Sequence, residues 1–216
     1  MTEHSDTAAA KLGRPRRVED DAVFAAMATV LMRVGLARLN VNLVAEEVGV
    51  TPAALRQRFG SKRELLAAFH AWGTRQIREI SAGQPAPDGS ALDALREMIR
   101  ESVAFVRTPT QIVNSMSVFT EIGEDPDLRR ILDERFTLAI DRSTALLEHA
   151  LDQGEIAGAD AAELARQLHY CLLGASLAWP VSGRRPIGDE LVDAADLLLA
   201  PYRPGNRTRP QRPATP

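Results

Sequence analysis

The stretch from residue 40 to residue 66 constrains this chain more than any other, because it holds start and stop signals for two short helices separated by a tight turn. Asn40 is a favourable N-cap for a first helix, and Gly49 suits the left-handed conformation that ends one. Thr51 and Pro52 then combine an N-cap with a residue preset for the first helical position, so a second helix begins there. Two such helices are typical of a helix-turn-helix that enters the major groove of DNA.

The second helix, expected over residues 52–59, separates apolar from polar side chains. Leu55 and Phe59 lie four residues apart and mark the buried face. The opposite face combines small side chains with hydrogen-bonding ones, which a major groove can accept. These outward residues are Ala53, Ala54, Arg56, Gln57 and Arg58. An ordinary tight turn between packed helices has the same local signals, so the flanking residues decide between the two interpretations.

The flanking residues favour a DNA-binding head. Residues 11–17 read KLGRPRR, a basic arm with helix-breaking residues. The apolar positions that follow keep helical spacing up to Gly35, which is expected to end this first helix. Its apolar residues are Val23, Met27, Val30, Leu31 and Val34. Downstream, Ser61 and Glu64 form a capping box that opens the next helix.

Over roughly residues 14–70 the chain resembles the TetR family of transcriptional regulators. The resemblance lies in the basic arm, the helix stop at Gly35, the segment VAEEVGVT at 44–51, FGSK at 59–62, and the leucine pair at 65–66. It implies a three-helix DNA-binding domain at residues 14–80, with the helix-turn-helix at about 40–59. It also implies an all-helical body that binds a ligand, and a homodimer on a palindromic operator.

The resemblance assigns DNA contacts by position. Thr51 and Lys62 are expected to bind phosphates, and the recognition helix is expected to present Pro52 with the outward residues named above. The family usually has a tyrosine where this chain has Arg56. A guanidinium there can bind a phosphate, read guanine through its two-pronged edge, or remain a solvated helix residue. The contact made by Arg56 therefore stays open.

Charge is divided unevenly along the chain, whose formal net charge is -3. Residues 1–75 hold eleven Lys and Arg against eight Asp and Glu, residues 76–201 hold eleven against twenty-one, and residues 202–216 hold four against none. Phosphates repel an acidic body, so this division orients the molecule head first on DNA. Segments 1–13 and 202–216 are predicted to be a disordered arm and a disordered basic tail. Candidates for minor-groove contacts are Arg14, Arg16 and Arg17.

The remaining chain predicts a purely helical body, so the whole fold is expected to be all-α with about nine helices. Residues 90–201 are expected to form this ligand-binding and dimerisation domain. Capping boxes and cap-and-proline pairs place its five helices at residues 91–107, from 109 onward, at 126–153, from 160 to Pro180, and between 186 and 201.

The last two of these helices are apolar on more than one face, as the segments LLGASLAW at 172–179 and LLL at 197–199 show. A helix that is apolar all round must be covered on all sides. A partner subunit is expected to provide this cover, and the family resemblance implies the same homodimer interface. An internal core is the alternative.

The three helices that start at 91, 109 and 126 carry candidates for binding a small, largely apolar effector with a few hydrogen-bonding groups. These candidates are Met98, Ser102, Phe105, Asn114, Met116, Ser117, Phe119, Thr120 and Phe136. Apolar residues at helical spacing are also the pattern of plain core.

No cofactor, metal site or enzyme activity is expected. His70, His149 and His169 have no partner at metal-ligand spacing, and no nucleophile is paired with a base. Cys171, the only cysteine, lies in an apolar helical pattern and is expected to be buried. No run approaches the roughly 18 apolar residues that span a bilayer, and the N-terminus has no signal-peptide pattern, so a cytoplasmic location is expected.

The sequence therefore predicts a ligand-responsive, DNA-binding transcriptional regulator. The first expectation is a repressor that binds a palindromic operator as a dimer and is released by its effector. A transcriptional activator of the same family is one alternative. A helical ligand carrier whose head does not bind DNA is another.

Overall fold

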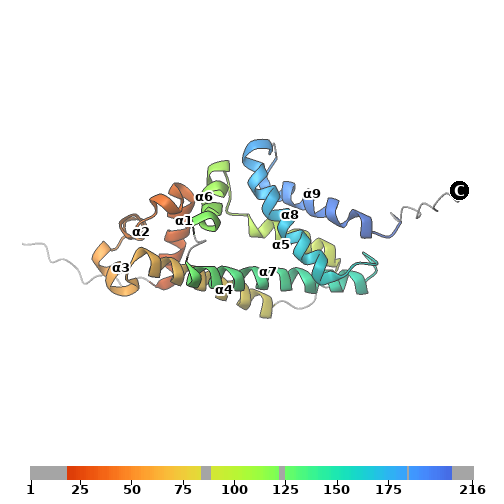
Figure 1. The fold of residues 1–216 in the computed structure, drawn as a ribbon, viewed down its shortest axis with the longest axis horizontal. Helices are drawn as coiled ribbons and strands as arrows, with labels where there is room; N and C mark the ends of the chain where they lie inside the picture. Colours follow the sequence, from red (N-terminus) through yellow and green to blue (C-terminus); the bar gives the residue numbers. More distant parts are fainter. Residues whose placement is uncertain (1–18, 84–88, 122–124, 184, 206–216) are drawn as a thin grey trace, which may run out of the picture.

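The computed structural model describes residues 19–83, 89–121, 125–183 and 185–205. All regular secondary structure in these residues is helical, which confirms the predicted fold class. The elements, labelled in Figure 1, are α1 (Asp20–Arg38), α2 (Val41–Val48), α3 (Pro52–Phe59), α4 (Lys62–Gly83), α5 (Ala91–Ser102), α6 (Pro109–Glu121), α7 (Pro126–Asp152), α8 (Ala161–Ser182), α9 (Ile187–Leu199) and the short 3-10 helix η1 (Ala200–Tyr202).

The molecule is elongated, with α1, α2 and α3 at one end and α8 and α9 toward the other (Figure 1). We call α1 to α3 with the first turns of α4 the head, and α5 to α9 the body. The helices α4 and α7 run side by side between the two ends, and α6 packs on α1. No helix in the described ranges is long and apolar enough to cross a membrane.

The head folds as its local signals predict. Asn40 Oδ1 accepts hydrogen bonds from two backbone N–H groups in the first turn of α2, at 3.0 and 3.1 Å, and Gly49 ends this helix with a φ of 76°. Thr51 Oγ1 accepts a hydrogen bond from the first turn of α3 at 3.2 Å. α3 then covers Pro52–Phe59, the residues expected for the second helix. These short-range caps fix both sides of the turn.

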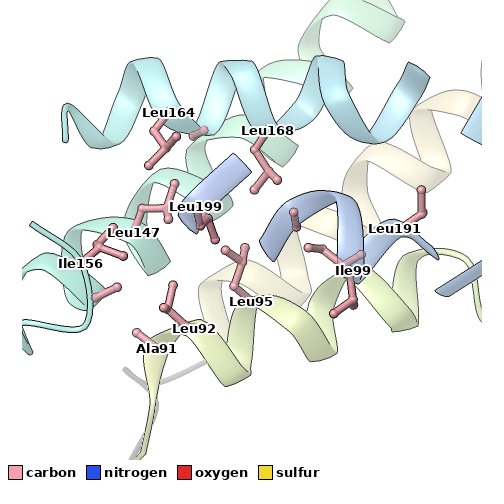
Figure 2. Packing of buried hydrophobic residues seen from close by; sticks show 14 of the residues in the cluster. Ala91, Leu92, Leu95, Ile99, Leu147, Ile156, Leu164, Leu168, Leu191 and Leu199 are labelled. Atoms are coloured by element: carbon pink, nitrogen blue, oxygen red, sulfur yellow. The ribbon is translucent and has the colours of Figure 1, made fainter. Parts of the chain in front are cut away.

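Two clusters of buried apolar side chains stabilise the fold. One lies in the head, and it includes Val118, Leu128 and Leu132 from α6 and α7 of the body. The other lies in the body, where Leu95 and Leu147 point into one core with side chains from α8 and α9 (Figure 2). Because body helices contribute to the head cluster, burial of apolar surface couples the head to the body.

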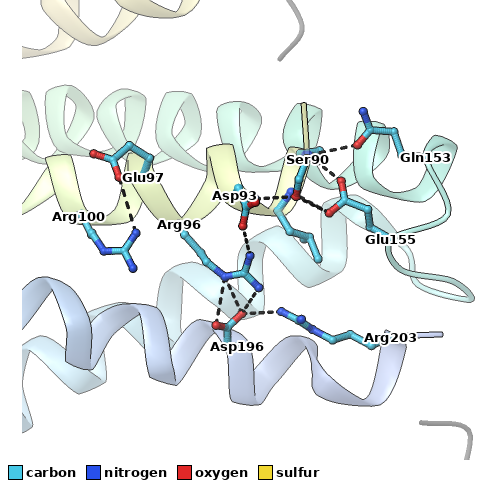
Figure 3. A network of polar contacts seen from close by, with 11 residues as sticks. Ser90, Asp93, Arg96, Glu97, Arg100, Gln153, Glu155, Asp196 and Arg203 are labelled. Atoms are coloured by element: carbon cyan, nitrogen blue, oxygen red, sulfur yellow. Dashed lines mark hydrogen bonds and ion pairs between the residues drawn. The ribbon is translucent and has the colours of Figure 1, made fainter. Parts of the chain in front are cut away.

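Polar contacts tie the start of α5 to the end of α7 and to α9 (Figure 3). Glu155 accepts hydrogen bonds from the Ser90 hydroxyl and the Ala91 backbone N–H, both at 2.6 Å. Two nitrogens of the Arg96 guanidinium donate to the Asp196 carboxylate, and this contact raises the pKa of Arg96. These contacts fix the position of α5 against the end of α7 and against α9.

The helix α5 is shorter than the sequence predicts, because it ends at Ser102 and not at Arg107. Val103 leaves the helical conformation, with φ -123° and ψ 10°, and the chain turns. Val103 and Val106 are nevertheless buried. The spacing of these apolar residues therefore indicates that they are buried, and residues in a turn can be buried as well. The prediction that the helix continues to Arg107 was wrong.

The end of α8 also differs from the prediction. α8 continues through Pro180 to Ser182, since a proline so close to the end removes only one hydrogen bond of the helix. Gly35, with a φ of 75° and a ψ of 168°, leaves the helical conformation and so ends the first helix as expected; a short helical turn then completes α1 up to Arg38. Cys171 is half-buried where burial was expected.

Candidate functional site

The recognition helix α3 presents a polar face away from the core of the head. Leu55 anchors it and is 2 % exposed, whereas Ala53, Arg56 and Gln57 are exposed on the other side. Thr51 and Arg58 are also exposed, and Pro52 and Ala54 are half-buried. One anchored face and one open face are what a helix needs to enter a major groove.

Arg56 is held by a contact with α2. Its Nη2 donates a hydrogen bond to Asn42 Oδ1 at 2.8 Å. A guanidinium has five N–H donors, so most of them remain available for a phosphate or a guanine edge. Sequence reasoning did not single out Asn42, because the two residues are 14 apart in the chain and meet only when α2 and α3 fold against each other.

Two other predicted DNA contacts are engaged inside the head. Arg58 forms an ion pair with Asp20 of α1 and lies over the Phe59 ring, 5.3 Å from its centroid. Lys62 Nζ donates to the Leu36 carbonyl at 2.7 Å, near the end of α1, where the helix dipole favours a cation. An ammonium has three donors, so Lys62 keeps two for a phosphate. The DNA contacts of Arg58 and Lys62 stay predictions.

The predicted contacts of the basic arm lie outside the described residues. Arg14, Arg16 and Arg17 belong to this group, as do the whole arm at 1–13 and residues 206–216 of the predicted tail. Their roles stay predictions.

Asn114 and Ser117, two of the candidates for effector binding, contact the head. Asn114 Nδ2 donates to the Met32 carbonyl at 2.8 Å, and Ser117 Oγ accepts a hydrogen bond from the Leu36 backbone N–H at 3.1 Å. The interruption of α1 at Gly35 leaves backbone groups that these side chains satisfy. In this structure both residues therefore link α6 to α1.

A cluster of charges joins the starts of α4 and α7. The Arg63 guanidinium binds the Asp125 carboxylate through two nitrogens, at 2.5 and 2.9 Å, and Asp127 at 2.7 Å. These contacts raise the pKa of Arg63 and lower that of Asp125. Asp125 also caps α7, so one carboxylate fixes both the helix start and its position against the head.

The remaining candidates for effector binding lie in different parts of the body. Phe119 and Phe136 stack with ring centroids 5.3 Å apart, and Phe136 also meets the His169 ring at 4.9 Å. Met98 and Met116 are partly buried against the body core. Ser102 and Phe105 are exposed near the end of α5. The side chain of Thr120 lies outside the described part of the structure.

An open hollow of about 490 Å³ lies between the end of α5 and the junction of α8 with α9. Val103, Trp179 and Ile187 are among the side chains that line it. None of the predicted effector-binding residues lines this hollow.

His70 of α4 is a buried polar residue to which sequence reasoning assigned no role. It is 3 % exposed, and neither ring nitrogen has a hydrogen-bond partner. Burial, followed by the positive charge of Arg135, lowers the pKa of His70 to about 4, so the ring is neutral near pH 7. Among the described residues, no group of three or more His, Cys, Asp or Glu is placed to hold a metal ion.

The helices α8 and α9 leave large apolar side chains exposed. Tyr170 and Leu177 are each 62 % exposed and Val181 is 92 % exposed, at spacings that place them along one side of α8. Leu197 of α9 is 78 % exposed. Groups of large exposed apolar side chains mark interaction surfaces, and we call these four residues of α8 and α9 the apolar stripe.

A capped tight turn and an exposed recognition helix define a helix-turn-helix DNA-binding protein. Comparison with known proteins narrows this class. Residues 24–69 match the family model described as bacterial regulatory proteins, tetR family. The chain is thus similar to the TetR family of transcriptional regulators, and the family match covers its DNA-binding head.

Similarity to individual members extends over most of the chain. YezE of Bacillus subtilis, described as an uncharacterized HTH-type transcriptional regulator, is 26% identical over 197 residues, which cover 88% of this chain and 98% of YezE. A TetR-family regulator structure from Rhodococcus sp. has a TM-score of 0.63 and 24% identity, over 83% of this chain and 98% of that one. Such relatives are regulators, in agreement with the expectation that this chain is not an enzyme.

A second similar structure contains a ligand. It is SmeT in complex with triclosan, with a TM-score of 0.63 and 22% identity, over 91% of this chain and 97% of SmeT. SmeT is the repressor of the Stenotrophomonas maltophilia multidrug efflux pump SmeDEF. At this identity the likeness is one of fold.

Proposed function

We propose that the protein is a repressor that binds a palindromic operator as a homodimer and is released by a small, largely apolar effector. The observation that carries this proposal is the outward face of α3, where Ala53, Arg56 and Gln57 are exposed while Leu55 anchors the helix. Small residues permit close approach to the bases, and Arg and Gln side chains can read base edges. A DNA-binding regulator acts in the cytoplasm, which is the location we propose.

The apolar stripe supports the homodimer. Two copies that place Tyr170, Leu177, Val181 and Leu197 against each other cover side chains that are exposed in one subunit. A two-fold interface of this kind brings the same patch from both subunits together, and its symmetry matches a palindromic operator.

The contacts between α6 and α1 give the body a route to the head. Two heads must lie about 34 to 36 Å apart to enter successive major grooves. A ligand that moves α6 also moves α1 through Asn114 and Ser117, and so changes this separation. A coupling of about 1 to 3 kcal/mol between effector and DNA is enough. The triclosan complex of SmeT supports ligand binding by a body of this fold.

The deciding experiment is selection of bound sequences from a random DNA pool at about 0.15 M salt, which suppresses nonspecific phosphate binding. The expected result is enrichment of an inverted repeat, which a dimeric helix-turn-helix protein selects. Absence of any enriched sequence contradicts the proposal and favours the helical ligand carrier. A reporter gene placed behind the selected operator then distinguishes a repressor from an activator, since expression falls with the first and rises with the second.

A further inference from the structure

Arg135 of α7 carries a guanidinium that makes no hydrogen bond or ion pair within the described part of the chain. Other arginines at the contact between α4 and α7 do have acidic partners, since Arg63 binds Asp125 and Arg78 binds Glu134. Arg135 is partly buried, and this burial lowers its pKa. A guanidinium does not release its proton in proteins, so the free protein holds a partly buried charge here without an acidic partner among the described residues.

Gly73 of α4 faces this guanidinium. A Cβ atom at residue 73 would lie 3.7 Å from Arg135 Nη1 and 4.0 Å from its Cζ, which are ordinary contact distances, with no other atom within 4 Å. The free protein thus has room for alanine at this position, and alanine is more stable than glycine inside a helix. Contacts in the free protein therefore do not explain why residue 73 is a glycine. The missing side chain leaves room beside the Arg135 guanidinium.

His70 lies three residues before Gly73, on the same side of α4. It is 3 % exposed, and both ring nitrogens lack partners. A buried polar group without a partner is rare in folded proteins, and a missing ligand is one physical reason for it. A neutral imidazole offers one N–H donor, so His70 can complement an anion that also binds Arg135.

We infer that Arg135 and His70 bind the carboxylate of an effector whose remaining part is apolar. This inference rests on the proposed function, in which the body of a regulator binds an effector. A carboxylate accepts two parallel N–H bonds from a guanidinium and has further lone pairs for the imidazole N–H. Gly73 leaves room for a further heavy atom beside the guanidinium.

The rest of the ligand is taken as apolar because the hydroxyls of the buried residues Thr74 and Ser143 on α4 and α7 already donate hydrogen bonds within the protein. The Thr74 hydroxyl donates to the His70 carbonyl, and the Ser143 hydroxyl donates to the Ala139 carbonyl. These two hydroxyls therefore have no proton left to donate to a second polar group on the ligand. An aliphatic carboxylate satisfies the charge without leaving polar groups unpaired.

The test compares butyrate, octanoate and dodecanoate with the alcohols of equal chain length, by calorimetric titration of the full-length protein. We expect at least one carboxylate to bind roughly tenfold or more tightly than its alcohol, because hydrogen bonds to charged groups are the strong ones. Arg135→Met should abolish this preference. Arg130→Met, on an exposed residue of the same helix, should retain it and serves as the matched control.

Stability of the free protein provides an independent measurement. Arg135→Met should raise the melting temperature without ligand, because it removes an unpaired charge and keeps the apolar stem. Gly73→Ala should also raise it, yet weaken carboxylate binding by filling the open space. A lower melting temperature for Arg135→Met assigns Arg135 a structural role and overturns the inference.

Two further results overturn the inference. One is equal binding, or no binding, of all carboxylates and alcohols by the wild-type protein, and the other is a carboxylate preference that survives in Arg135→Met. The DNA selection described above separates the two proposals. An inverted repeat without carboxylate binding leaves the regulator standing, whereas carboxylate binding without DNA enrichment contradicts the regulator and keeps the anion site.

Discussion

Replacing His70 by leucine should remove part of the acid sensitivity of the fold. The pKa of a histidine in an unfolded chain is about 6.5, and that of His70 in the folded protein is about 4. Between these values the unfolded chain binds a proton that the native ring does not, so the free energy of unfolding falls as the pH drops through this window. The full effect is about 3 kcal/mol, of which about 2 kcal/mol is lost by about pH 5.

The assay is urea unfolding followed by circular dichroism at about pH 7.5 and about pH 5, with equal protein concentrations because association would shift the apparent stability. The His70→Leu variant should lose about 2 kcal/mol less than the wild type between the two conditions. The pKa of His169 is also lowered by burial, but this residue is present in both proteins and cancels in the difference. An identical loss of stability in the two proteins would refute the reasoning.

Three more predictions address DNA, the dimer and the link between head and body. Gln57→Ala should relax the preference at one base pair, whereas Lys62→Ala should weaken binding to all sequences and lower the salt slope by about one contact, as titrations of operator variants at several salt concentrations will show. Leu177→Glu places a charge in the apolar stripe and should yield monomers in analytical ultracentrifugation; a persistent dimer would locate the interface elsewhere. Asn114→Ala removes the hydrogen bond to the Met32 carbonyl and should cost about 1 kcal/mol in urea unfolding. It should also reduce the effect of the effector on operator binding, and an unchanged response would exclude this route.

Local signals were sufficient to predict the helix-turn-helix. The side chains of Asn40 and Thr51 cap the helices that follow them, and Gly49 takes the left-handed conformation, as their positions in the sequence indicate. Such interactions span only a few residues, so a sequence contains both partners of each contact. The same holds for Asp125 and Asp160, which cap α7 and α8.

Features that depend on contacts between residues far apart in the chain could not be predicted from the sequence. Asn114 was predicted to bind the effector, yet its amide donates a hydrogen bond to the Met32 carbonyl of α1, 82 residues away in the chain. Nothing in the sequence relates Arg135 to His70, and only the packing of α7 on α4 brings this charge close to an imidazole without partners. Val103 shows a third limit, since apolar spacing indicates burial and does not distinguish a turn from a helix.

The sharing of Val118, Leu128 and Leu132 between body and head has a consequence for hybrid regulators. A head transplanted onto a foreign body loses these three side chains and presents a bare apolar surface in their place. Exchange of operator specificity by exchange of heads will therefore succeed only when the recipient carries matching apolar residues on its own α6 and α7. Substitutions confined to the outward face of α3 avoid this requirement and are the more direct way to retarget the protein.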